Sequence, residues 1–167
     1  MKKIFLPLAV FVASFVYYAF QACPTFYFWD PAELTAAVLG DGVPHPPGFP
    51  ALLLLGKLWT ALMPLDGTFS LDIMSAFFAS IGLTFWFQVS RLFFRKVFAE
   101  KKQAVIEVLS LLSIMILGTS FSFSIQAVRF EVYSFNFACF AILAYLAFRV
   151  SMTSNSISLR KIHPGLM

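Results

Sequence analysis

The sequence predicts an all-α, polytopic membrane protein with about four transmembrane helices and a long helical first outer loop. Hydrophobic residues make up 60% of the 167 residues and charged residues only 12%, whereas a soluble domain typically carries about 25% charged residues. The same composition excludes intrinsic disorder, which requires low hydrophobicity and high net charge. The chain also contains four apolar runs near the length of about 20 residues that crosses a bilayer.

The predicted spans lie at about 4–22, 69–94, 104–125 and 132–150, with a polar cytoplasmic tail at 151–167. The first run has no charged residue, and we expect it to stay uncleaved because Phe20 is bulky where a signal-peptide cleavage site requires a small residue. A cleaved signal peptide is the alternative. The two cysteines, Cys23 and Cys139, are too few to predict a disulfide framework.

The distribution of charge predicts the orientation of these spans. With a cytoplasmic N-terminus, ten of the twelve basic residues fall on the cytoplasmic side, as the positive-inside rule requires: Lys2, Lys3, Arg91, Arg95, Lys96, Lys101, Lys102, Arg149, Arg160 and Lys161. Six of the eight acidic residues fall outside. We therefore expect a multi-pass protein of the bacterial inner membrane with both termini in the cytoplasm. The net charge of +4 reflects topology, and nucleic acid is not expected as a partner.

The segment 23–68 differs from the spans because it holds seven of the nine prolines and several acidic residues. Asp30 is a preferred N-cap, and Glu33 lies where the second half of a capping box belongs. A helix is therefore predicted from Asp30 to about Gly40, which can end it. Prolines on both sides of His45 hold that residue on a stiff, non-helical stretch. A second helix is predicted from near Pro50 to residue 62.

Five ionisable residues on the predicted outer side are the candidate site: Asp30, Glu33, His45, Arg129 and Glu131. Ionisable groups near the membrane are frequently functional, carboxylates and histidine can carry out acid–base catalysis, and arginine can hold a phosphate. Plainer interpretations stay open. The two carboxylates could form only a capping box, His45 could be a loop residue without a role, and Arg129 with Glu131 could be an interfacial ion pair.

Several motifs resemble a bacterial family of protein O-mannosyltransferase-like membrane proteins within the GT-C glycosyltransferase superfamily. They are Asp-x-x-Glu at 30–33, His-Pro-Pro-Gly-Phe-Pro at 45–50, Leu-Gly-Lys-Leu at 55–58 and Glu-Val-Tyr-Ser at 131–134. The resemblance covers roughly residues 10–150. One departure is Asp72, where the family often has asparagine.

The resemblance implies transfer of a sugar, with mannose as the candidate, from a polyprenyl-phosphate donor to an acceptor hydroxyl on the outer face. Asp30 would be the general base, and Glu33 would position the acceptor or support Asp30. His45 and Arg129 would bind the donor phosphate, while Glu131 would orient Arg129 or bind a sugar hydroxyl. No cofactor is certain, and a divalent metal at Asp30 is left undecided.

The resemblance also implies partners: membrane lipid, the lipid-linked sugar, and a protein or glycan acceptor. GT-C enzymes have more spans than four, so we expect this chain to be an N-terminal module or a fragment whose remainder is encoded downstream. The alternative function is a truncated, non-catalytic membrane subunit or lipid-binding remnant. A small transporter is less favoured, because no charged residue lies deep within a predicted span.

Overall fold

The computed structural model describes residues 2–25 and 27–162, with side chains described for 5–25 and 27–153. Within these residues the chain is helical and contains no strand, which confirms the predicted all-α class. The helices are α1 (Lys2–Ala19), α2 (Asp30–Leu39), α3 (Pro50–Leu62), α4 (Gly67–Val97), α5 (Gln103–Thr119), α6 (Phe121–Ala127) and α7 (Val132–Ile162).

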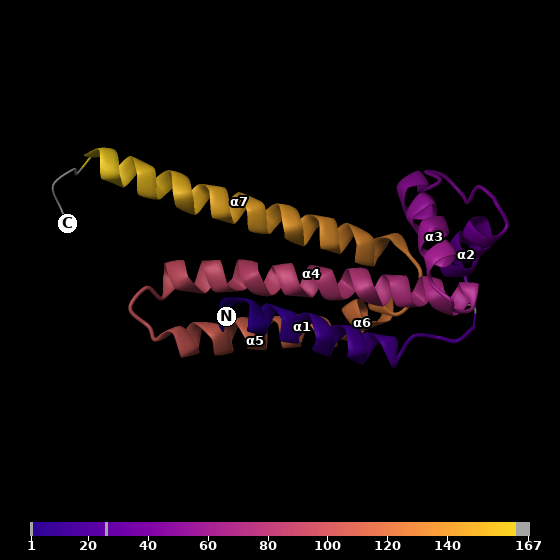
Figure 1. Cartoon of the computed structure of the whole chain (residues 1–167), viewed down its shortest axis with the longest axis horizontal. Helices are drawn as coiled ribbons and strands as arrows, with labels where there is room; N and C mark the ends of the chain where they lie inside the picture. Colours follow the sequence, from indigo (N-terminus) through magenta and orange to yellow (C-terminus); the bar gives the residue numbers. More distant parts are fainter. Residues whose placement is uncertain (1, 26, 163–167) are drawn as a thin grey trace.

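The helix α4 is the centre of the structure, because it contacts each of the other six helices. Helices α1, α4, α5 and α7 run along the long axis of the molecule (Figure 1). The short helices α2, α3 and α6 gather at one end of α4, and the turn between α4 and α5 lies at the other end. One end of the molecule is therefore covered by short helices, and the other end holds the turn between α4 and α5.

Two helices, α4 and the Val132–Thr153 part of α7, are long and apolar enough to cross a membrane. A third span is possible if α5 and α6 count as one bent span. The sequence predicted about four spans. The first predicted run forms α1 (Lys2–Ala19), of which the Phe5–Ala19 stretch is a shorter apolar helix.

The predicted span 104–125 is interrupted at Ser120, where the axes of α5 and α6 differ by 71°. Ser120 adopts an extended conformation with ψ 141°. Its hydroxyl donates to the carbonyl of Leu117 at 2.7 Å, and the hydroxyl of Ser124 donates to the carbonyl of Gly118 at 2.9 Å. Local side-chain hydrogen bonds thus satisfy backbone groups that the break releases.

The segment predicted as a polar tail at 151–167 begins as helix, because α7 continues without a break to Ile162. Its polar residues are compatible with this, as the hydroxyl of Thr153 donates to the carbonyl of Arg149 within the helix at 3.0 Å. Residues 163–167 of the predicted tail lie outside the described residues.

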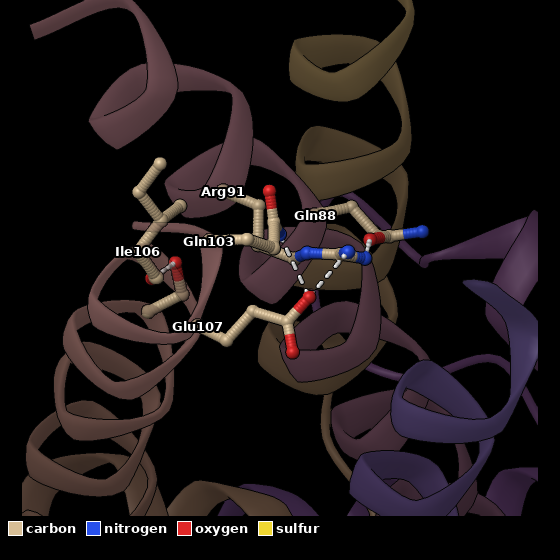
Figure 2. Close-up of polar contacts among 6 residues, drawn as sticks. Gln88, Arg91, Gln103, Ile106 and Glu107 are labelled. Carbon is tan, nitrogen blue, oxygen red and sulfur yellow. Dashed lines mark hydrogen bonds and ion pairs between the residues drawn. The ribbon is translucent and has the colours of Figure 1, made fainter. Parts of the chain in front are cut away.

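At the end of α4 away from α2 and α3, Arg91 joins α4 to α5 (Figure 2). Its Nη2 donates to Glu107 Oε1 at 3.0 Å, and its Nη1 donates to Gln88 at 2.9 Å. Gln103 donates to the same Glu107 oxygen at 2.8 Å. Because Arg91 and Glu107 compensate each other's charge, both can lie near the ends of apolar helices.

A hydrophobic cluster fixes α2 and α3 on α4. It joins α2, α3, α4 and the turn before α7 through Leu34, Val38, Leu52, Leu71, Met74 and Phe130. The indole of Trp59 in α3 donates to the carbonyl of Ser70 in α4 at 2.8 Å. The segment between the first two long helices is therefore a packed unit, and it can hold side chains in fixed positions.

Gly82 lies in a close contact between α4 and α7, because a Cβ atom there would lie 2.3 Å from the ring of Phe137. We expect Gly82→Leu to overpack this contact and lower stability by about 1–3 kcal/mol. Thermal unfolding of the purified chain in detergent measures the effect. Ala147→Leu, at an exposed position of α7, is the matched control, and equal midpoints for the two variants would contradict the packing described here.

Candidate functional site

The five candidate residues lie on two segments at the α2–α3 end of α4. Asp30 and Glu33 are in the first turn of α2, and His45 is in the loop that joins α2 to α3. Arg129 and Glu131 flank Phe130 in the short turn between α6 and α7. The structure brings the first three together and pairs the last two.

Glu33 binds His45 through both of its carboxylate oxygens. Oε1 accepts the backbone N–H of His45 at 2.6 Å, and Oε2 lies 2.6 Å from the ring Nδ1. This excludes the expected capping box, because Glu33 reaches forward to the loop. The residue that caps α2 is Trp29, with φ 66° and no side-chain cap bond, and Asp30 is already within the helix.

The pairing shifts the pKa values of both groups in opposite directions. The hydrogen bonds from His45 lower the pKa of Glu33. The hydrogen bond to Glu33 raises the pKa of His45, and the nearby charges of Glu33 and Asp30 add to this rise. Because the His45 pKa is raised, the imidazolium form extends to higher pH than in an isolated histidine.

The loop that carries His45 is held at several points. The ring of His45 packs edge-on against Phe49, with 5.8 Å between ring centroids. The amide of Gly48, which has φ 79°, donates to the carbonyl of His45 at 2.9 Å. Lys57 in α3 forms an ion pair with Asp41 at the start of the loop. His45 is therefore an organised loop residue that is bonded to α2.

The second pair is more buried. Arg129 Nε lies 3.4 Å from Glu131 Oε1, and the two side chains are 17% and 8% exposed. Arg129 also donates from Nε and Nη2 to Gln126 Oε1 at 3.1 and 3.0 Å. Burial raises the pKa of Glu131, Arg129 opposes this rise, and the charge of Asp30 adds to it. Gln126 was not identified from the sequence as a partner of Arg129. Its position three residues before Arg129, at the end of α6, is a spacing at which helical side chains can meet.

Asp30 lies close to Glu33 and His45, and its charge contributes to the raised pKa of both His45 and Glu131. Its side chain is exposed, and no described residue forms a hydrogen bond with its carboxylate. Asp30 is thus the one acidic group of the five that is free to accept a proton from a molecule bound at this end.

Asp30, Glu33 and His45 could also hold a cation, because they offer ligand atoms within 4.8 Å of one another. Carboxylate and imidazole ligands suit a divalent metal such as Zn²⁺ or Mn²⁺. However, Glu33 Oε2 and His45 Nδ1 already bind each other. A metal ion bound by these two atoms would replace the hydrogen bond between them.

A cavity of about 300 Å³ is lined in part by Gln126, the hydrogen-bond partner of Arg129. Its lining combines hydroxyl and amide groups with aromatic rings from α5, α6 and α7: Leu117, Ser120, Ser122, Phe123, Gln126, Tyr133, Ser134 and Phe137. Gln126 belongs both to this lining and to the hydrogen bonds of Arg129. Tyr133 and Ser134 come from the Glu-Val-Tyr-Ser motif, so the motif contributes to the ion pair and to the cavity.

Residues 30–163 match the family model described as the protein O-mannosyl-transferase TMEM260 N-terminal domain. The match covers more than three-quarters of the chain and includes all five candidate residues. No curated protein matches the chain, and neither does any solved structure.

The Glu33–His45 pair should stabilise the folded chain only within a limited pH range. The stabilisation from His45 is fully present below the pKa of His45 in the unfolded chain, and it is lost as the pH rises through the raised pKa of the folded chain. The stabilisation from Glu33 is present above the pKa of Glu33 in the unfolded chain, and it is lost as the pH falls through the lowered pKa of the folded chain. We expect Glu33→Gln to lower the pKa of His45 toward its ordinary value.

An NMR titration of the His45 ring, in a chain where His163 is replaced by Gln, measures this pKa. Asp41→Asn is the control, because it removes a different ion pair of the same loop. An identical His45 titration in the Glu33→Gln variant and the unchanged chain would refute the pairing.

Proposed function

The chain belongs to the family of the protein O-mannosyl-transferase TMEM260 N-terminal domain, and from this premise we propose that it is a glycosyltransferase module of the GT-C class. It transfers a sugar, with mannose as the candidate, from a polyprenyl-phosphate donor to an acceptor hydroxyl on the outer face of the membrane. The observation that carries this proposal is the unbonded carboxylate of Asp30, which lies close to Glu33 and His45 and whose charge contributes to the raised pKa of Glu131.

In this proposal Asp30 is the general base. The acceptor oxygen forms a bond to the anomeric carbon of the sugar while its proton passes to the Asp30 carboxylate. The bond between the anomeric carbon and the phosphate oxygen breaks, and its electron pair leaves with the polyprenyl phosphate. A carboxylate that accepts no hydrogen bond from the described residues is available for this proton transfer.

Arg129 is proposed to bind the donor phosphate. Gln126 and Glu131 engage its Nε and Nη2, and no described group accepts a hydrogen bond from its Nη1, so this N–H edge of the guanidinium is available to an anion. An oriented arginine can stabilise the charge that develops on the departing phosphate. Glu131 then has the role of orienting Arg129.

His45 is the second candidate for the phosphate, because the raised pKa favours its charged form. Glu33 binds His45, so we assign it to holding the imidazolium in place. This differs from the expectation that Glu33 positions the acceptor or supports Asp30.

The cavity lined by Gln126 is proposed to take the sugar. Hydroxyl and amide groups can hydrogen-bond to sugar hydroxyls, and the aromatic rings of Phe123, Tyr133 and Phe137 can pack against the ring of a hexose. Because Gln126 contacts Arg129 and lines the cavity, a sugar in the cavity would have its phosphate next to the guanidinium.

A non-catalytic, lipid-binding subunit is the second candidate function. It is favoured by an apolar cleft of about 360 Å³ between α1, α4 and α5, lined by residues such as Val10, Leu83 and Ile114. Such a subunit would bind lipid-linked sugar without using Asp30.

We expect Asp30→Asn to reduce sugar transfer by about 100-fold or more, because general-base catalysis contributes about 10²–10⁴-fold. The measurement is transfer from a radiolabelled polyprenyl-phosphate mannose in native membranes whose chromosomal copy carries the substitution. Asp41→Asn removes an exposed carboxylate of the same outer segment and should leave transfer within about twofold of the unchanged level. Undiminished transfer by Asp30→Asn would favour the lipid-binding subunit.

A further inference from the structure

Asp72 is a buried carboxylate that the proposed reaction does not use. It lies in the first turns of α4 and is 3% exposed. Its Oδ1 accepts the backbone N–H of Phe130 at 2.7 Å, across 58 residues of sequence. Its Oδ2 is buried and has no hydrogen-bond partner within the described part of the chain.

The residue that Asp72 binds lies between Arg129 and Glu131. Phe130 is fully buried, and its ring packs in the cluster that joins α2, α3 and α4. The turn between α6 and α7 is not helical at this point, so no helical carbonyl can accept the Phe130 N–H. Asp72 supplies that acceptor, and the turn is therefore fixed by its buried ring and by its backbone.

The charge of Asp72 is not needed for this bond. Burial of a carboxylate with one free oxygen is unfavourable, since the lost hydration is only partly replaced. Asparagine would provide the same kind of acceptor oxygen without that charge. Leucine has a similar size but no acceptor, and it would leave the buried Phe130 N–H unsatisfied.

We infer that Asp72 is a positioning residue that fixes the turn 129–131 on α4 and so aligns Arg129 and Glu131 for the donor phosphate. This inference rests on the proposed function for the role of Arg129. The hydrogen bond itself can be tested independently of transfer activity.

The test compares Asp72→Asn with Asp72→Leu in the purified chain in detergent micelles. Hydrogen–deuterium exchange of the peptide that covers residues 128–132 reports on the Phe130 amide. We expect exchange to accelerate by roughly tenfold in Asp72→Leu and to stay near the unchanged rate in Asp72→Asn. Ser80→Ala is the control, because its buried hydroxyl on α4 binds only within that helix, at the carbonyl of Ala76.

Binding of a short-chain polyprenyl phosphate to the same proteins tests the positioning role. We expect affinity to fall by roughly tenfold in Asp72→Leu and to be retained in Asp72→Asn and Ser80→Ala. If Asp72→Leu does not fold, Asp72→Ala replaces it, since that variant also lacks the acceptor without adding apolar volume.

Unchanged exchange in the variant without an acceptor would overturn the inference, as would equal acceleration in Asp72→Asn. Faster exchange with unchanged lipid-phosphate affinity would overturn the positioning role. If the unchanged chain does not bind polyprenyl phosphate, the proposed function fails, while the exchange comparison still decides whether Asp72 fixes the turn.

Discussion

The packing of one helix, α4, determines where every other described element lies. It contacts the other six helices, and at Gly82 its backbone comes so close to Phe137 of α7 that no side chain fits between them. Its first turns bind Phe130 through Asp72 and Trp59 through the carbonyl of Ser70. Segments that are far apart in the sequence, 30–45 and 126–131, therefore meet at the same end of this helix.

The paired ionisable groups lie near the two ends of α4. Arg91, Gln103 and Glu107 join α4 to α5 near the turn that links these helices, whereas the Glu33–His45 and Arg129–Glu131 pairs lie at the other end. An apolar bundle tolerates ionisable groups near its ends, where each can find a partner or water. Asp30 differs from these paired groups because its carboxylate remains unbonded, and this is why it carries the proposed chemistry.

Local signals in the sequence predicted much of the segment 23–68, including the helix that ends near Gly40 and the one that begins at Pro50. The five candidate residues could be named because motifs and topology placed them on one side. Their partners could not be predicted. Glu33 satisfied the pattern of a capping box, but the folding of the loop presents His45 to it. The Asp72–Phe130 hydrogen bond joins residues 58 positions apart, so no local pattern in the sequence indicates it. The break at Ser120 involves serine hydroxyl groups that a continuous helix can also accommodate, so the break could not be predicted either.

The central claim is that the start of α2 and the turn before α7 form one site. Cysteines at positions 30 and 131, in a chain whose Cys23 and Cys139 are replaced, test it through cross-linking with a short bifunctional maleimide in membranes. A cysteine pair at 41 and 57 is the positive control, since Asp41 and Lys57 are in contact. The account predicts efficient cross-linking of both pairs. Cross-linking of the control alone would show that the two segments do not share a site.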